Sequence, residues 1–119
     1  MSRKNGGCAM KFIKLAACIP FAFAATAVKA EPDPAEVQQI LTSNACLACH
    51  AVDKKMVGPS YRDVADKYEN EDNAAETLSK HIREGSSGIW GAVPMPPNAG
   101  ISDDDLAKVV EWVLAGAPE

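Results

Sequence analysis

Residues 46–50 read Cys-Leu-Ala-Cys-His, and this short stretch decides how the rest of the chain is interpreted. Two cysteines three positions apart, with a histidine directly after the second, form the C-x-x-C-H pattern of haem c attachment. Two thiols about one helical turn apart can add to the two vinyl groups on one porphyrin edge, and the adjacent histidine then presents its imidazole to the iron. The pattern therefore predicts a covalently bound haem c, held through Cys46 and Cys49, with His50 as one iron ligand.

Three other kinds of site use the same residue types: a redox dithiol, a disulfide and half of a zinc site. A thiol–disulfide enzyme is expected in a βαβ context, and the hydrophobic periodicity of this chain indicates no strands. A structural zinc site needs two further cysteine or histidine ligands at regular spacing. After His50 the chain offers only His81. Haem attachment is therefore the interpretation that the residues favour.

Met95 is the candidate for the second axial ligand of the iron. The other methionine after residue 30 is Met56, which lies only six positions from His50 and cannot easily reach the opposite face of the ring. Met95 lies in the stretch VPMPP (residues 93–97), whose prolines restrict the backbone around the sulfur. Histidine and methionine together fill both axial positions and raise the reduction potential, which suits an electron carrier. The alternative is a haem domain with a displaceable methionine that acts as a gas sensor or a peroxidase-like catalyst.

On both sides of the motif, the sequence predicts helices, with one long loop before the last of them. Capping residues and helical spacing of apolar side chains predict helices from Asp33 to about Cys46–His50, over 60–68, over 73–84, and from Ser102 to the C-terminus. Residues 85–100 hold four glycines and three prolines and predict a loop without regular structure. Because no segment alternates apolar and polar residues, the expected fold class is all-α. The expected core positions are Val37, Ile40, Leu41, Tyr61, Val64, Leu78, Ile82, Val109, Trp112 and Val113.

The first thirty residues have the layout of a secretory signal peptide. They contain five basic residues and no acidic one, and the stretch from Leu15 to Val28 carries no charge. This stretch is shorter than the roughly 18–20 apolar residues that span a bilayer. Val28-Lys29-Ala30 places small residues at the positions that signal peptidase requires. We therefore expect residues 1–30 to be a signal peptide cleaved after Ala30, with export to the periplasm and no stable membrane insertion afterwards; an uncleaved anchor is the alternative.

Residues 31–119 form one small and strongly acidic domain. They hold all sixteen acidic residues and seven of the twelve basic ones, which gives a formal charge of −9 against −4 for the whole chain. This balance excludes a basic nucleic-acid-binding domain. A domain of this size buries limited apolar surface, so a bulky cofactor is expected to complete its core.

Three stretches of the chain resemble the small bacterial class I cytochromes c of the cytochrome c-551 (cytochrome c8) type. The stretches are CLACHAVDKKMVGPSYRDVA (46–65), IREGSSGIWGAVPMPPNA (82–99) and SDDDLAKVVEWVL (102–114). The resemblance implies a small monohaem fold of about four helices wrapped around one haem. It also implies a periplasmic one-electron carrier, not itself an enzyme, that delivers electrons to a haem-containing nitrite reductase, a peroxidase or a terminal oxidase.

The resemblance also assigns roles to four residues beside the two ligands. Pro59 is expected to accept a hydrogen bond from the ring N–H of His50 through its backbone carbonyl, which fixes the tautomer of the imidazole. Trp90 is expected to donate its indole N–H to a haem propionate, and Asn98 to hydrogen-bond the ligand sulfur. His81 is expected near a propionate. The alternatives are plain turns at Pro59 and Asn98, core packing for Trp90, and a partly exposed helix histidine for His81.

Two departures from the family pattern stand out. Ala45 occupies a position where glycine is common, at the expected crossing of the first helix with Trp112 in the last. The link Ala99–Ser102 is one residue longer than usual.

For partners, we expect redox proteins that dock transiently at an exposed haem edge, and a monomeric chain. Small apolar residues would form the contact and nearby lysines would steer the approach. The expected contact residues are Leu47, Ala48, Val93, Pro96 and Pro97, and the expected steering residues are Lys54 and Lys55.

Overall fold

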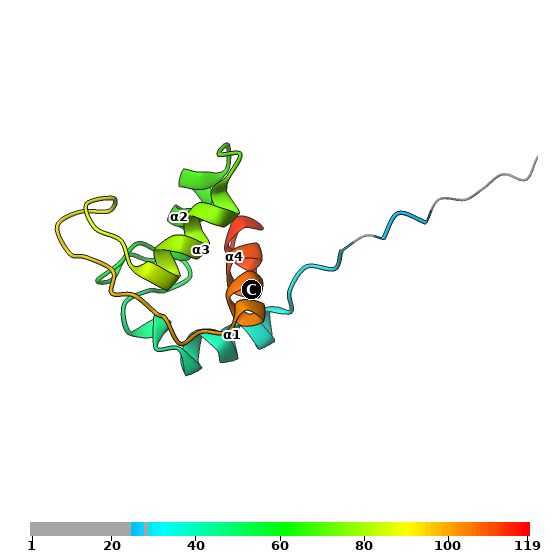
Figure 1. Cartoon of the computed structure of the whole chain (residues 1–119), viewed down its shortest axis with the longest axis horizontal. Helices are drawn as coiled ribbons and strands as arrows, with labels where there is room; N and C mark the ends of the chain where they lie inside the picture. Colours follow the sequence, from blue (N-terminus) through cyan, green and yellow to red (C-terminus); the bar gives the residue numbers. More distant parts are fainter. Residues whose placement is uncertain (1–24, 28) are drawn as a thin grey trace, which may run out of the picture.

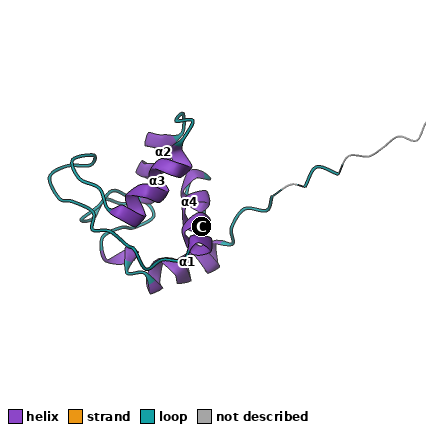
Figure 2. Ribbon diagram, viewed as in Figure 1, coloured by secondary structure: helices purple, strands orange, loops and turns teal. Residues whose placement is uncertain are grey.

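The computed structural model describes residues 25–27 and 29–119. This part of the chain contains four α-helices and one short 3-10 helix, with no β-strand (Figure 1, Figure 2). The elements are α1 (Pro34–Ser43), η1 (Cys46–Ala48), α2 (Tyr61–Tyr68), α3 (Ala74–Glu84) and α4 (Asp103–Leu114). The all-α fold class predicted from the sequence is confirmed.

Side-chain caps explain where three of the helices begin. Asp33, Ser60 and Ser102 each accept a hydrogen bond from a backbone N–H two or three residues further along, at 2.7, 3.0 and 3.1 Å. Such a cap satisfies an N–H group that has no partner inside the helix and contributes about 1 kcal/mol. The helix starts predicted at these residues are confirmed.

The first helix is shorter than predicted. The sequence periodicity extends it to about Cys46–His50, whereas α1 ends at Ser43. Ala45 interrupts the helical path because its backbone is left-handed, with φ +57°, and η1 begins at the next residue. The expected crossing of this position with Trp112 stays a prediction. The glycine preference at this position therefore has a conformational cause, since a left-handed backbone is unfavourable for a residue with a Cβ.

Helix α4 is the centre of the core and packs against α1, α2 and α3. Its Trp112 is buried, and the indole N–H donates to the Pro118 carbonyl at 2.9 Å, which fastens the end of the chain to the helix. Ile82, a predicted core residue, is only partly buried because it lines a cavity. The other nine predicted core positions are buried: Val37, Ile40, Leu41, Tyr61, Val64, Leu78, Val109, Trp112 and Val113.

Residues 85–100 form the predicted long loop, which leaves α3, swings outward and returns to α4 (Figure 1). An isolated antiparallel bridge between Ser86 and Met95 closes its base. At its return, Ile101 is buried and its carbonyl accepts a hydrogen bond from Arg83 of α3 at 2.7 Å. The link Ala99–Ser102 is thus attached to α3, and its extra residue relative to the family stays a prediction.

Residues 1–24 and 28, which include most of the predicted signal peptide, lie outside the described residues. The signal peptide and its cleavage after Ala30 therefore stay predictions. Among the residues that the structure does describe, no helix combines the length and the apolar character needed to cross a bilayer.

Candidate functional site

The two cysteines of the C-x-x-C-H motif lie in a single tight turn. The backbone N–H groups of Cys49 and His50 both donate to the carbonyl of Cys46, at 3.2 and 3.0 Å. Both thiols are half-buried, and burial raises the pKa of the Cys46 thiol. The turn directs Cys46, Cys49 and His50 into one cavity, which is the arrangement that attachment of one planar group requires.

The imidazole of His50 is fixed on three sides. Its Nδ1 donates to the Pro59 carbonyl at 2.7 Å, which is the contact expected for Pro59. The ring of Tyr61 stacks against it, with centroids 5.2 Å apart and an interplanar angle of 29°. A Cβ on Gly58 would lie 2.6 Å from His50 Cε1, so only glycine leaves room for the ring. Because a carbonyl can only accept, the proton is on Nδ1, and Nε2 keeps the lone pair that a metal needs.

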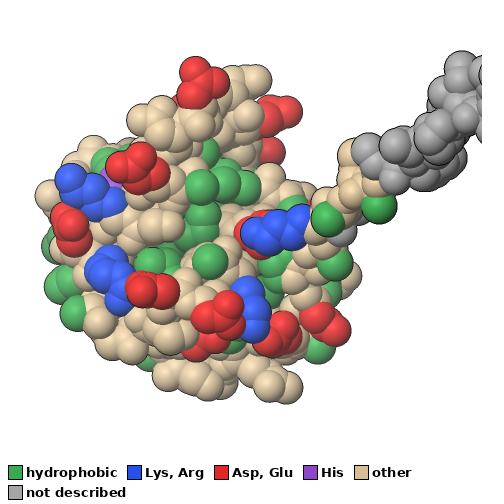
Figure 3. Space-filling view, turned by 45° about the vertical axis from the view of Figure 1, so that its right-hand side comes forward, with side chains coloured by type: hydrophobic (Ala, Val, Ile, Leu, Met, Phe, Trp, Pro, Cys, Tyr) green, Lys and Arg blue, Asp and Glu red, His purple; other side chains and the backbone are tan. Residues whose placement is uncertain are grey.

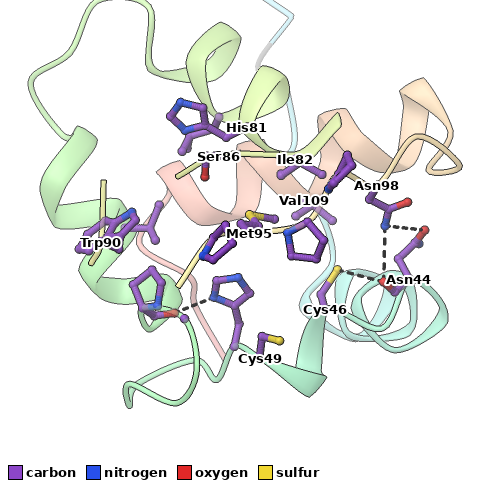
Figure 4. A pocket seen from close by; sticks show the side chains of 18 of the residues that line it. Asn44, Cys46, Cys49, His81, Ile82, Ser86, Trp90, Met95, Asn98 and Val109 are labelled. Atoms are coloured by element: carbon purple, nitrogen blue, oxygen red, sulfur yellow. Dashed lines mark hydrogen bonds between the residues drawn. The ribbon is translucent and has the colours of Figure 1, made fainter. Parts of the chain in front are cut away.

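Met95 reaches the same cavity from the long loop. Its backbone N–H donates to the Ser86 carbonyl at 2.8 Å, and its carbonyl accepts from the Ser86 N–H at 3.1 Å. The backbone N–H of Asn98 donates to the Ile82 carbonyl at 2.8 Å. The half-buried Met95 is thus attached to the end of α3, and its side chain lines the cavity (Figure 4).

The cavity has a volume of about 590 Å³, within the range of cofactor and ligand sites. Figure 4 shows Cys46 and Cys49 on one wall, Ile82 and Val109 on the helical side, and Met95 between them. Two thiols, an imidazole nitrogen and a thioether sulfur are the attachment and ligand groups of a haem c. The room that Gly58 leaves for the His50 ring and the apolar wall formed by the helices also suit a haem. The residues present therefore match the cofactor that the sequence predicts.

The three other predicted site residues also line this cavity, and their contacts differ from one another. Trp90 is 37% exposed, and Lys67 Nζ lies 5.6 Å from its ring centroid. His81 is half-buried and packs edge-on against Tyr68, with centroids 6.4 Å apart. Their roles toward propionates stay predictions.

Asn98 uses its side-chain amide differently from the expectation. In this structure the amide donates to the backbone carbonyl and to the side-chain oxygen of Asn44, both at 3.4 Å (Figure 4). Its hydrogen bond to the Met95 sulfur stays a prediction.

Sequence reasoning missed three contributors to the site. Tyr61 was expected only as a core residue, yet it forms one wall of His50 and is itself braced edge-on by Trp112 at 5.2 Å. Gly58 and Gly85 carry no side-chain chemistry for the sequence to single out, yet each passes too close to a site residue to carry a side chain. The signal available for Gly58 was its place directly before Pro59, whose carbonyl faces the same ring.

The chain is similar over most of its length to known proteins. The family model described as Cytochrome c matches residues 34–117. Cytochrome c-551 of Pseudomonas aeruginosa is 49% identical over 82 residues, which cover 68% of this chain and 78% of that protein. Cytochrome c-552 of Nitrosomonas europaea is 49% identical over 71 residues, which cover 60% of this chain and 69% of that protein.

Solved structures give the same result. The crystal structure of wild-type Nitrosomonas europaea cytochrome c552 matches with a TM-score of 0.64 and 44% identity, covering 66% of this chain and 98% of that one. The class 1 cytochrome MtoD from Sideroxydans lithotrophicus matches with a TM-score of 0.61 and 30% identity, covering 71% of this chain and 96% of that one. The chain therefore belongs to the cytochrome c family, and its cofactor is haem c, bound covalently at the motif that holds Cys46 and Cys49.

Proposed function

We propose that the chain is a periplasmic one-electron carrier in which His50 and Met95 are the two axial ligands of the iron. The observation that carries the proposal is that the imidazole and the thioether, from positions 45 residues apart, line the same cavity as both cysteines. Bound haem supplies a metal centre that accepts and releases one electron. The chain supplies ligands that stay the same in both oxidation states, so little has to move on electron transfer.

The two ligands affect the metal in different ways. The hydrogen bond from His50 Nδ1 to the Pro59 carbonyl fixes the tautomer and increases the basicity of Nε2. The soft sulfur of Met95 favours the ferrous state and raises the reduction potential. With His50 and Met95 both bound to the iron, no position would be open to oxygen or peroxide, which supports a carrier and not an enzyme.

Spectroscopy of the purified protein tests this assignment. We expect haem to stay with the chain on a denaturing gel, and the ferric spectrum to show the weak charge-transfer band of methionine sulfur at its red end. Carbon monoxide should fail to bind the ferrous protein at neutral pH, whereas Met95→Ala should lose the band and bind it. Ready binding of carbon monoxide to the unmodified protein would instead support the gas sensor or peroxidase-like catalyst.

We further propose that Trp90 and His81 contact the haem propionates, with the Lys67 ammonium beside Trp90 adding positive charge near them. A protonated histidine near a propionate would raise the midpoint potential. A redox titration across about pH 5–8 tests this, because imidazole titrates in that range. The role of His81 is wrong if His81→Ala leaves the pH dependence of the potential unchanged.

We also propose that electron donors and acceptors dock transiently at the open side of the cavity. The large apolar side chains exposed on the chain's described part include Val57, Ile89, Trp90 and Val93, all of which also line the cavity. Figure 3 shows positive and negative side chains interspersed on one face of the molecule, with apolar groups between them. Small contacts of this kind are typical of short-lived electron-transfer complexes.

From the resemblance to the cytochrome c-551 type, we propose that the chain is monomeric and delivers electrons to a haem-containing nitrite reductase, a peroxidase or a terminal oxidase. The exposed Lys54 and Lys55 would steer the approach of the partner. Reversing both charges should change the association rate and its salt dependence. An association rate that stays unchanged at every salt concentration would contradict this docking surface.

A further inference from the structure

Gly85 passes closer to the methionine segment than any residue with a side chain could. It ends α3 with φ +81° and ψ 170°, a conformation that is essentially restricted to glycine. A Cβ at this position would lie 2.8 Å from the Met95 carbonyl oxygen and 3.1 Å from Pro97 N. Both neighbours are backbone atoms, which cannot turn aside as the end of a flexible side chain can.

Backbone hydrogen bonds hold the methionine segment at this close distance. Within residues 94–98, three positions are proline, so only Met95 and Asn98 have an N–H to donate. Met95 donates to the carbonyl of Ser86, the residue directly after Gly85, and Asn98 donates to the carbonyl of Ile82 in the last turn of α3, each at 2.8 Å. Both backbone donors of this segment are therefore bonded on either side of Gly85.

We propose that Gly85 is a positioning residue that sets how deeply Met95 enters the cavity. The end of α3 and the methionine segment form two layers in direct contact, and the missing side chain of Gly85 fixes the spacing between them. Any increase in that spacing moves the Met95 backbone away from α3 and changes the position of its sulfur. This inference rests on the proposed function, in which the Met95 sulfur is an axial ligand.

A pair of glycine variants isolates the effect. Gly91 lies in the same loop and has a φ of +125°, but a Cβ added there meets nothing within 4 Å, and Gly91 is not part of the cavity lining. Gly91→Ala therefore introduces positive-φ strain without a collision, whereas Gly85→Ala introduces both. In the ferric holoprotein we expect Gly85→Ala to bind added imidazole about tenfold more tightly than the unmodified protein, because a misplaced sulfur competes less well. Gly91→Ala should bind imidazole within about twofold of the unmodified protein.

A second variant keeps the proposal testable if Gly85→Ala does not fold. Ser86→Pro removes the N–H that donates to the Met95 carbonyl at 3.1 Å and leaves Gly85 in place. It should also increase imidazole affinity and weaken the methionine charge-transfer band. The unfolding midpoint of each variant, measured in parallel, separates a weaker ligand from a weaker fold.

The outcomes distinguish this inference from the proposed function. If the unmodified protein shows the sulfur band and the Gly85→Ala and Gly91→Ala proteins bind imidazole equally, the positioning role of Gly85 is wrong and Met95 ligation stands. If Gly85→Ala loses only stability, with its sulfur band and imidazole affinity unchanged, the positioning role is equally wrong. If the unmodified protein itself lacks the band, the ligand assignment of Met95 fails first.

Discussion

The two proposed iron ligands, His50 and Met95, are held by different means. His50 is fixed by residues that follow it closely in sequence, through the Pro59 carbonyl, the Tyr61 ring and the close approach of Gly58. Met95 is fixed by backbone hydrogen bonds to Ser86, two residues after the end of α3, within a loop whose prolines are exposed. The histidine side is therefore part of the packed interior, and the methionine side is a loop fastened to it.

Because the two sides are held differently, substitutions beside His50 and beside Met95 should affect different properties, namely the stability of the domain and the strength of the sulfur ligand. A change beside His50 disturbs α2 and the core, so it should lower the free energy of unfolding of the whole domain. A change beside Met95 disturbs a fastening between a loop and one helix end, so it should weaken the sulfur ligand at a smaller cost in global stability. Substitutions on the two sides should therefore have separable effects.

The largest effect is expected on the histidine side, from Gly58→Ala. The new Cβ would lie 2.6 Å from His50 Cε1, and the ring cannot retreat because Tyr61 stacks on it. We expect a loss of about 2–3 kcal/mol in the free energy of unfolding of the holoprotein, measured with guanidinium chloride. Gly100→Ala is the control, since its nearest neighbour would be Asn98 Oδ1 at 4.0 Å. Equal losses in both variants would contradict the close packing around the imidazole.

A smaller effect is expected on the methionine side, from Arg83→Met. The guanidinium donates to the carbonyls of Ile101 and Ala99, at 2.7 and 3.4 Å, and pairs with Asp103 at 2.6 Å. Loss of the charged donor should cost about 1–2 kcal/mol in unfolding free energy and increase imidazole affinity. Asp103→Asn removes only the exposed ion pair and should cost less than about 0.5 kcal/mol. If both variants cost the same, the carbonyl contacts do not fasten the loop.

The next effect is a gain in stability, expected at Ala45, the left-handed residue directly before Cys46. Ala45→Gly should raise the free energy of unfolding by about 1 kcal/mol, because it relieves a left-handed backbone in the turn before the cysteines. Ala117 has a similar φ of +50° but is fully buried, so Ala117→Gly also loses the burial of a methyl group. That loss of about 0.8 kcal/mol cancels most of the gain. Thermal unfolding of both variants checks this, and equal gains would contradict the account.

The smallest effect concerns the direct link between the two sides. The Asn98 amide donates to Asn44, next to the cysteine turn, at 3.4 Å. A double-mutant cycle with Asn44→Ala and Asn98→Ala should give a coupling of about 0.5 kcal/mol in unfolding free energy. The midpoint potentials of the two single variants decide what Asn98 contacts. A potential that shifts only in Asn98→Ala would support the hydrogen bond to the Met95 sulfur.

Much of the fold could be predicted from local pattern. The capping residues Asp33, Ser60 and Ser102 and the helical spacing of apolar side chains gave the starts of the helices, because both act within a few residues. The end of α1 could not be predicted in this way. The left-handed backbone of Ala45 is imposed by the turn that presents the cysteines, and alanine itself gives no sign of it.

The residues that carry the chemistry of the site could be predicted from the sequence, whereas most of the contacts that position them could not. Cys46, Cys49, His50 and Met95 line one cavity because the motif and the proline-rich segment carry recognisable chemistry. The contacts of Gly85 with Met95 and of Asn98 with Asn44 join segments 10 and 54 positions apart. Such approaches depend on tertiary packing, which a hydrophobic pattern does not encode.

The cavity is lined by apolar side chains of α4, among them Val109, Val110 and Val113. Bound haem covers this lining and interacts with the folded chain, so it should stabilise the fold. Chains that have not received their prosthetic group should therefore be less stable and more open to proteases. Proteolytic removal of such chains would act as quality control, so that the surviving pool is almost entirely mature protein.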